Sequence, residues 1–438
     1  MKRICTLFLM LTVATLIIFA FASCDKATEG LEFYEYEDGY AASISDGKFL
    51  DKIVIPKEHN GKSVVAISKR GFSGCENAVT ISIPNTVKTI DEGAFQNCYK
   101  LESITIPSSV TVIGESAFKG CKALKSIEIP SSVTSIGKSA FSNCRELTSI
   151  QIGDTVTEIG ALAFEGCTAL ESVTIPRNVN KIGEGVFQGC TKLTSISVDE
   201  SSESYASENG VLYNKDMTAL IQYPIGKKEF EFVAPASITS VGAYAFAGGS
   251  ALTKLSLPGT VTSVGEKAFD GCPIENAVAP ACAIKEISQD TIKTFEINGG
   301  EKIEKNAFRN CQFLKRVTIT GVKEIGDSAF YNCASLRSAA LGEGLEIIDE
   351  YAFKGCVYLS EVTLPDSLKT IGASAFKDCN RIAKIIIPIN VETIDMYAFE
   401  GCISIRIYCR AAGKPSGWNK WWNSDSSKYS VTWRYAGE

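Results

Sequence analysis

Cysteine is the residue type with the most chemical potential in this sequence. The chain has 16 cysteines but a single histidine, His59. Cysteine thiols can ligate metals, form disulfides or act as nucleophiles. Twelve of the cysteines each follow a phenylalanine by three residues: Cys75, Cys98, Cys121, Cys144, Cys167, Cys190, Cys272, Cys311, Cys333, Cys356, Cys379 and Cys402. The regularity of this spacing decides which chemistry is available.

Catalysis and metal binding both need partners that the sequence lacks. Structural zinc sites use closely spaced cysteines and histidines, but the chain contains no Cys-x-x-Cys pair. A serine or cysteine nucleophile would have to use His59 as its base, far from any conspicuous nucleophile. No glycine-rich phosphate loop is present either. The sequence therefore predicts no enzyme activity, no metal site and no cofactor.

The regular spacing instead predicts a row of buried free thiols. Cysteine behaves as a small hydrophobe and is often buried. Cysteines on adjacent repeats would lie within disulfide reach, but stacked parallel side chains point the same way, which disfavours bridging. Cys282 and Cys409 fall outside the row. We interpret these two as the cysteines that could be exposed.

A repeat of about 23 residues must position this row. The phenylalanines from Phe72 to Phe187 recur at a constant step of 23 residues, which is typical of a solenoid. In one repeat, Ile104 and Ile106 alternate with hydroxyl residues, as in a strand with one buried face. The segment from Ala117 to Cys121 predicts one turn of α- or 3₁₀-helix. One such repeat buries too little apolar surface to fold alone, so repeats must stack.

The unit L-x-x-I-x-I-P-x-x-V-x-x-I-G-x-x-A-F-x-x-C resembles the BspA-like leucine-rich repeat family over about residues 30–438. The resemblance implies an α/β solenoid, a right-handed superhelix of short parallel strands and short helical turns with N- and C-terminal caps. Leucine-rich repeats usually carry an asparagine after the strand. Here Thr86, Ser109, Ser132 and Thr155 occupy that position, so we expect hydroxyl groups to take over its hydrogen bonds.

The first residues predict export. Lys2 and Arg3 precede a long apolar run, and residues 1–23 have the order of a signal peptide. The sequence Ala22-Ser23-Cys24 resembles a bacterial lipobox, which implies acylation of Cys24 and a lipid anchor. The alternative is an uncleaved anchor, because the run is long enough to span a membrane. Loss of residues 1–23 would change the formal net charge from −6 to −8, which disfavours a nucleic-acid partner.

The remaining chain divides into a cap, a solenoid and a second cap. Residues 24–66 are predicted as the N-terminal cap, 67–402 as the solenoid and 403–438 as the C-terminal cap. The solenoid contains a predicted hairpin insertion at about 199–234 and degenerate repeats at about 273–302. All four tryptophans lie in the last segment. We expect them to shield the final repeat, with a sugar-stacking platform as the alternative.

Two surfaces are candidates for binding a partner. The first is the row of outward strand residues, and the second is the insertion with the neighbouring mixed-charge face. Tyrosine often dominates interfaces, although the insertion tyrosines could instead pack on the base of their own hairpin. The candidate residues are Thr105, Glu128, Gln151 and Thr174 on the row, and Tyr205, Tyr213, Tyr223, Lys254 and Arg316 at the insertion and beside it.

The family resemblance implies a function at the cell surface or outer membrane. It predicts a lipid-anchored protein that binds another protein, in adhesion to host or matrix components or to other cells. Two alternatives remain open from the sequence. One is a structural scaffold of the cell envelope, and the other is a carbohydrate-binding surface protein that uses the C-terminal tryptophans.

Overall fold

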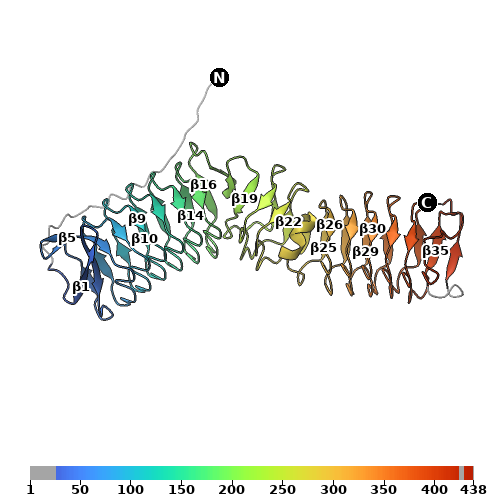
Figure 1. Ribbon diagram of the computed structural model, residues 1–438, viewed down its shortest axis with the longest axis horizontal. Helices are drawn as coiled ribbons and strands as arrows, with labels where there is room; N and C mark the ends of the chain where they lie inside the picture. The colour runs from blue at the N-terminus through green and yellow to red at the C-terminus, as the bar shows by residue number, and fades with distance from the viewer. Residues whose placement is uncertain (1–25, 424–428, 438) are drawn as a thin grey trace, which may run out of the picture.

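The chain forms one long rod of stacked turns. The computed structural model describes residues 26–423 and 429–437. The turns lie side by side from the N-terminal hairpin to the C-terminal cap, and the rod bends near its middle, between β16 and β22 (Figure 1). Within the described ranges, no helix is long and apolar enough to cross a membrane. The predicted signal peptide at 1–23 and the acylation site at Cys24 lie outside the described residues.

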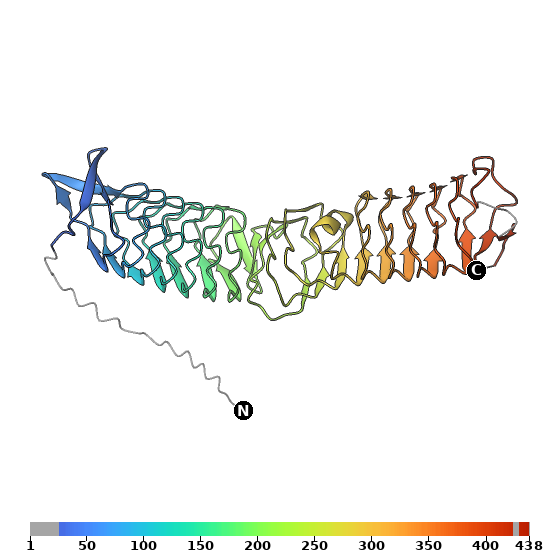
Figure 2. The same ribbon diagram turned by 90° about the horizontal axis from the view of Figure 1, so that it is seen from below.

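Each turn contributes one strand to a row that we call the front ladder. Most neighbouring strands pair in parallel and in register, so that Ser126 lies opposite Ser149 and Ile127 opposite Ile150. Figure 2 shows these strands as a row of arrows along one long edge of the rod. The front strands are β3 (Lys52–Val54), β6 (Thr80–Ser82), β8 (Ser103–Ile104), β10 (Ser126–Ile129), β12 (Ser149–Ile152), β14 (Ser172–Ile175), β16 (Ser195–Val198), β20 (Glu231–Val233), β22 (Lys254–Ser256), β24 (Asn276–Ala279), β25 (Thr294–Ile297), β27 (Arg316–Ile319), β29 (Ser338–Leu341), β31 (Glu361–Thr363), β33 (Lys384–Ile387), β35 (Arg406–Cys409) and β36 (Ser430–Thr432).

A second row, the back ladder, is made mostly of two-residue strands later in each turn. These strands also pair in parallel, as Ile113 does with Ile136. The back strands are β7 (Thr89–Ile90), β9 (Val112–Ile113), β11 (Ser135–Ile136), β13 (Glu158–Ile159), β15 (Lys181–Ile182), β19 (Ala219–Gln222), β21 (Ser240–Val241), β23 (Ser263–Val264), β26 (Lys302–Ile303), β28 (Glu324–Ile325), β30 (Ile347–Ile348), β32 (Thr370–Ile371) and β34 (Thr393–Ile394). The one 3₁₀-helix of the described chain, η1 (Ala281–Glu286), lies between β23 and β26.

The N-terminal end is closed by a hairpin. β1 (Leu31–Tyr36) and β2 (Gly39–Ile44) are antiparallel. β2 then pairs in parallel with β5 (Lys62–Ile67), which also carries the short antiparallel strand β4 (Glu58–His59). Because β5 pairs with β7 on its other side, the cap continues directly into the back ladder.

A column of stacked phenylalanine rings fills the core. The rings of Phe118 and Phe141 are 5.2 Å apart and tilted by only 3°, and the Phe353–Phe376 pair has the same geometry. These rings are buried. Each turn therefore covers an aromatic face that its neighbour would otherwise expose to water, which is why an isolated turn would not be stable.

The predicted helical turn at each phenylalanine is wrong. Ser116 and Gly120 both have positive φ, at 56° and 77°. These left-handed residues bracket Ala117 to Lys119 and leave too few residues between them for a helix to propagate. The N–H groups of Ser116, Phe118 and Gly120 instead donate to carbonyls of the next turn, at 2.7–2.8 Å. The segment thus forms bonds along the rod rather than around a helix.

The degenerate repeats keep the front ladder continuous. β24 pairs in parallel with β22 on one side and with β25 on the other. Phe295 on β25 is buried against Phe308, at a ring distance of 5.3 Å. The helix η1 takes the place that a back strand occupies in regular turns.

The insertion joins two separate parts of the core. β17 (Tyr205–Glu208) and β18 (Val211–Asn214) form an antiparallel hairpin, and β18 pairs antiparallel with β19. β19 then pairs in parallel with β21, where the back ladder resumes. Leu212 packs into the N-terminal part of the core, whereas Val211 and Tyr213 pack into the C-terminal part.

Hydroxyl groups replace the asparagines of other leucine-rich repeats, as predicted. Thr86 Oγ1 donates to Val64 O at 2.7 Å, and Ser109 Oγ to Val87 O at 2.6 Å. Thr155, Thr260 and Ser367 form equivalent bonds to the preceding turn. Ser132 is an exception, since its buried hydroxyl has no partner among the described residues.

These hydroxyl bonds should contribute measurably to stability. Replacing Thr86 with valine keeps the shape of the side chain but leaves the carbonyl of Val64 without its donor. We expect Thr86→Val to lower the free energy of unfolding by about 1 kcal/mol in urea titrations of residues 25–438. Thr134→Val is the control, because the Thr134 hydroxyl is exposed and makes a longer bond of 3.3 Å. Equal losses in both variants would contradict the role of the hydroxyl row.

Candidate binding surface

The cysteine row is structural rather than reactive. Cys121 Sγ lies 3.2 Å from Phe95 O, to which it donates, and Cys144 Sγ makes the same bond to Phe118 O at 3.3 Å. All fourteen cysteines in the described chain are unbridged, which confirms the prediction of free thiols. Burial raises the pKa of Cys190 and Cys402 to about 12. Thiols with such a pKa stay protonated at neutral pH and are poor nucleophiles.

The two cysteines outside the row differ from each other. Cys409 is fully buried on β35, so the expectation that it could be exposed is wrong. Cys409 is the last residue of β35 and occupies an inward-facing position of this front strand, opposite buried Ile387 on β33. Its thiol therefore lies in the core. Cys282 on η1 is half-buried, and burial raises its pKa as well.

The single histidine belongs to the N-terminal cap. The ring of His59 stacks on Phe33 with centroids 4.0 Å apart, and it meets the ring of Tyr40 edge-on at 5.2 Å. Across the part of the chain that the structure describes, no three histidine, cysteine or acidic side chains gather as metal ligands. The absence of an enzyme activity, a metal and a cofactor stays a prediction.

The three insertion tyrosines are core residues, so their assignment to a binding surface is wrong. Tyr205, Tyr213 and Tyr223 are all buried. Tyr205 Oη accepts a hydrogen bond from the N–H of Ile182 at 2.9 Å. Burial raises the pKa of Tyr213 and Tyr223 to about 12. The alternative interpretation, in which the insertion tyrosines pack at the base of their own hairpin, agrees better with their burial than the binding-surface interpretation does.

Tyr223 occupies a phenylalanine position of the repeat. Its ring stacks on Phe246 at 4.9 Å, and its N–H donates to Ala245 O at 2.8 Å, as most repeat phenylalanines do to their next turn. Part of the insertion is therefore one more turn of the solenoid. The sequence contained this signal, since Tyr223 precedes Phe246 by the usual 23 residues. A search for aromatic residues in general would have found it.

The predicted outward row lies on the exposed side of the front ladder. Thr105, Glu128, Gln151 and Thr174 are all exposed, each on the turn that follows the last. Glu128 on β10 lies opposite Gln151 on β12. These side chains are therefore accessible to a partner, and their use in binding stays a prediction.

Lys254 and Arg316 lie on the same face in the second half of the rod. Lys254 on β22 and Arg316 on β27 are separated by β24 and β25 and are both exposed. The ammonium group of Lys254 lies over the ring of Phe230, at 5.3 Å from its centre. This part of the face is the mixed-charge surface that the sequence predicted.

The sequence reasoning missed a cluster of cations around Arg316. At two other places, charges just before the front strands are compensated by the neighbouring turn, in the ion pairs Glu102–Lys125 at 2.7 Å and Glu275–Lys293 at 2.6 Å. The next two turns carry Lys315 and Arg337 at this position, and the N–H of Arg337 donates to Lys315 O at 2.9 Å.

Lys315, Arg316 and Arg337 therefore lie close together on adjacent turns, and we call them the basic column. All three are exposed, and none forms an ion pair within the described residues. Like charges on neighbouring strands are destabilising. The signal was present in the sequence as cations spaced by one repeat, but only the register shows that they are neighbours.

The C-terminal tryptophans mainly close the end of the core. Trp418 and Trp422 are buried, and Trp418 Nε1 donates to Val391 O at 3.0 Å. The ring of Trp422 meets Phe399, the last of the phenylalanine column, edge-on at 6.1 Å. Trp421 is 48% exposed. Trp433 is half-buried and packs against Trp418. The arrangement fits the predicted cap and leaves only Trp421 exposed among the four tryptophans.

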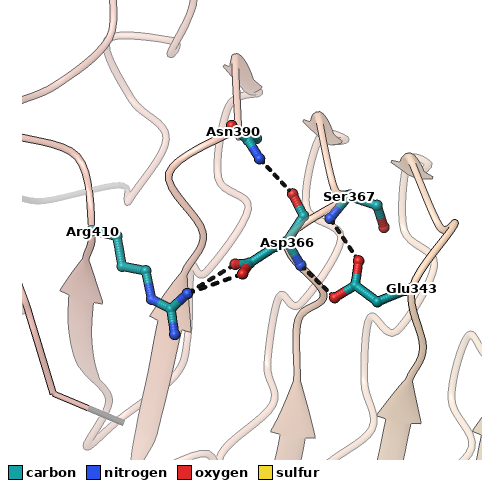
Figure 3. Close-up of polar contacts among 5 residues, drawn as sticks. All are labelled: Glu343, Asp366, Ser367, Asn390 and Arg410. Atoms are coloured by element: carbon teal, nitrogen blue, oxygen red, sulfur yellow. Dashed lines mark hydrogen bonds and ion pairs between the residues drawn. The ribbon is translucent and has the colours of Figure 1, made fainter.

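A polar brace supports the front face beside this cap. Arg410 Nη1 contacts both carboxylate oxygens of Asp366, at 2.9 and 3.2 Å. Glu343 accepts hydrogen bonds from the backbone N–H groups of Asp366 and Ser367, and Asn390 Nδ2 donates to Asp366 O (Figure 3). A shallow cavity of about 330 Å³ lies beside the brace, lined by Lys384 and Ile386. Because its charged groups already bond to each other, the brace is a structural feature.

Two parallel ladders around one stacked core define a solenoid of the leucine-rich repeat class. The sequence profile described as the BspA type leucine rich repeat region matches residues 42–167, 111–223, 226–298 and 288–406. These ranges cover most of the chain, so the chain belongs to the BspA-type leucine-rich repeat family.

Solved structures of bacterial leucine-rich repeat proteins are similar. A leucine-rich repeat protein from Bacteroides ovatus is 25% identical, with a TM-score of 0.53 over 93% of this chain and 99% of that one. A leucine rich cell surface protein from Faecalibacterium prausnitzii is 27% identical, with a TM-score of 0.46 over 82% and 93%. The pneumococcal vaccine antigen PcpA is 20% identical, with a TM-score of 0.55 over 94% and 98%. No curated protein matches the sequence.

The burial of the cysteine row predicts how its thiols react with an alkylating reagent. In native protein at pH 8, an alkylating reagent should leave all twelve row cysteines unlabelled, because they are buried and protonated. In urea without reductant, mass spectrometry should find all twelve labelled. Half-buried Cys282 provides an internal comparison, since it should react slowly in the native state. Row cysteines that resist labelling in urea until a reductant is added would show disulfides and contradict the structure.

Proposed function

We propose that this protein is an exported, lipid-anchored surface protein that binds another protein through the front face of its rod. The proposed role is adhesion, to host or matrix components or to neighbouring cells. Membership of the BspA-type family supports a surface location, since similar solved proteins include one described as a cell surface protein. The lipid at Cys24 would hold the rod at the outer face of a membrane.

The basic column is the observation that carries this proposal. Lys315, Arg316 and Arg337 place three exposed cations on two adjacent turns of a chain whose net charge is −6. Their mutual repulsion opposes stability of the isolated rod. An acidic surface on a partner would relieve that repulsion, and arginine is well suited to bind carboxylates in a bidentate manner. Phe313, two residues before Lys315 in the chain, also has an exposed side chain.

The two alternative functions have less support. A purely structural scaffold does not explain why cations gather on adjacent turns. A carbohydrate platform at the C-terminus would need several exposed aromatic rings, whereas Trp418 and Trp422 are buried in the cap. The adhesion proposal therefore remains the one that the surface favours.

Neutralising the basic column should weaken binding. We expect Lys315→Gln/Arg316→Gln/Arg337→Gln to lower affinity for its matrix-protein partner at least about tenfold, or about 1.4 kcal/mol. Surface plasmon resonance against a panel of purified extracellular matrix proteins would measure this. Binding of the unmodified protein should also weaken as salt increases, because exposed charges are screened.

A matched control removes the same charge from paired cations. Lys125, Arg177 and Lys369 each form an exposed ion pair with the preceding turn. The variant Lys125→Gln/Arg177→Gln/Lys369→Gln should bind within about twofold of the unmodified protein, since these sites lie away from the column. Equal losses in both triple variants would indicate a general charge effect and contradict a specific surface.

The anchoring proposal predicts a defined covalent product. Protein extracted from membranes of the expressing bacterium should lack residues 1–23 and carry lipid on Cys24, as measured by intact-mass spectrometry. Cys24→Ala should prevent the lipid addition and the cleavage that depends on it. A membrane-extracted chain that still begins at Met1, or a mature chain without lipid, would disprove acylation at this position.

A further inference from the structure

The front ladder is divided into several sheets, and one of the divisions lies where the insertion meets the second half of the rod. β16 ends one group of front strands, and β20 begins the next. The rod bends in this region (Figure 1). Strand edges inside a solenoid are normally paired with the next turn, so the interruption leaves two edges that need another cover.

The edge of β16 is covered by the insertion. The N–H of Ile196 donates to Gly210 O at 2.9 Å, and the N–H of Val198 donates to Ser207 Oγ at 3.2 Å. The hairpin of β17 and β18 therefore takes the place of the next front strand on this side. It prevents β16 from pairing with a foreign strand.

The edge of β20 has no such strand. β20 is the terminal strand of its sheet and pairs only with β22. Phe230 O accepts hydrogen bonds from the β22 side, and the N–H of Ala234 donates to Ser256 O at 2.9 Å. Alternate residues of a strand direct their backbone groups to opposite sides. The N–H and C=O groups of Glu231 and Val233 therefore point to the side where no strand of the described chain pairs with them.

The side chains at this edge are unusually apolar for a free strand. Phe230 is 57% exposed and Val233 is 65% exposed. Proteins usually protect free edges with lysine, proline or a covering segment, because an exposed apolar edge recruits further strands. Here Glu231 is the only charged residue of β20. The edge is thus suited to strand addition.

A cavity of about 520 Å³ lies between β20 and the insertion. Tyr213, Tyr223 and Phe232 line its apolar part. Its rim carries Glu208, Glu229 and Glu231 against one cation, Lys227, which is paired with Glu229 at 3.2 Å. The remaining negative charge of the rim favours a cationic ligand.

We propose that the free edge of β20 is a docking site for an extended, cationic segment of a partner protein, which adds to the sheet as one further strand. The backbone of that segment would pair with Glu231 and Val233. Apolar side chains on its inward face would enter the cavity, and basic side chains would lie beside the acidic rim. Strand addition of this kind obtains affinity from backbone bonds and specificity from alternate side chains.

This site goes beyond the adhesion surface proposed above. The basic column lies beside β27 and β29 and attracts acidic groups, whereas the edge of β20 attracts basic ones. Either site can therefore fail without the other. The basic-column variant tests only the adhesion surface, and a variant of β20 tests only the strand edge. The two proposals are therefore tested by separate variants.

The first test uses residues 25–438 without any substitution. The probe is a short fluorescent peptide of alternating valine and lysine, and anisotropy measures its binding. A second peptide carries N-methyl groups on the amides that would pair with β20, and a third replaces lysine by glutamate. We expect each change to weaken binding at least about tenfold. Equal binding of the N-methylated peptide would overturn strand addition, and equal binding of the glutamate peptide would overturn the cationic partner.

The second test changes the edge itself. Val233→Pro removes the outward N–H and is compatible with an edge strand, where that group bonds to no neighbouring strand. Val233→Thr is the control, because it keeps both the N–H and the strand preference. We expect the proline variant to lose at least about tenfold in peptide affinity and the threonine variant less than about threefold. Unchanged binding by a proline variant with the same thermal midpoint would overturn the proposal.

Sedimentation velocity, which measures the oligomeric state, tests whether a second copy of this chain occupies the β20 edge instead of a partner protein. A second copy of this chain could also cover the β20 edge. A dimer of the unmodified protein that Val233→Pro converts to monomer, together with no binding of the valine–lysine peptide, would assign the edge to self-association and overturn the partner proposed here. A monomer that binds the peptide supports it.

Discussion

The stacking of one turn on the next, in register, is the constraint on which the whole rod depends. Backbone groups at the front strand, the back strand and the phenylalanine segment all bond along the rod to neighbouring turns. The stacked phenylalanine rings and the thiols beside them can bury their surfaces only if this register is kept. Every turn is therefore stabilised by its neighbours, and a turn without a neighbour exposes both core and unpaired backbone.

This dependence explains where the irregular elements lie. The β1–β2 hairpin continues into the back ladder at one end, and Trp422 covers Phe399 at the other. The insertion solves the same problem in the middle of the rod. Tyr223 continues the aromatic column, while β18 places Leu212 in one part of the core and Tyr213 in the other. A deletion of the insertion would consequently open the core on both sides rather than shorten a surface loop.

The same register arranges the surface. Side chains one repeat apart become neighbours, so opposite charges at that spacing form ion pairs such as Glu102–Lys125. Where Lys315 and Arg337 repeat the same charge, the rod acquires a concentrated basic surface instead. The acidic rim beside β20 is a second local departure. The surface of an otherwise uniform rod thus becomes chemically distinct where the repeat is broken or its charge pattern changes. These are the places where a partner protein could be recognised specifically.

The sequence by itself determined the solenoid, the front strands, the buried free thiols and the hydroxyl row. These features follow from the 23-residue period, because residues at equal positions in stacked turns must meet. It could not determine that the Ala-Phe-x-x-Cys segment avoids helix, since that depends on positive φ at Ser116 and Gly120 and on bonds to the next turn. Nor could it show that Tyr205, Tyr213 and Tyr223 are buried, because a tyrosine in an insertion fits either a surface or a core until the insertion is placed. Only the tertiary structure decided which strand edge the insertion covers and which it leaves open, because edge pairing depends on where the chain returns in space rather than on local residue pattern.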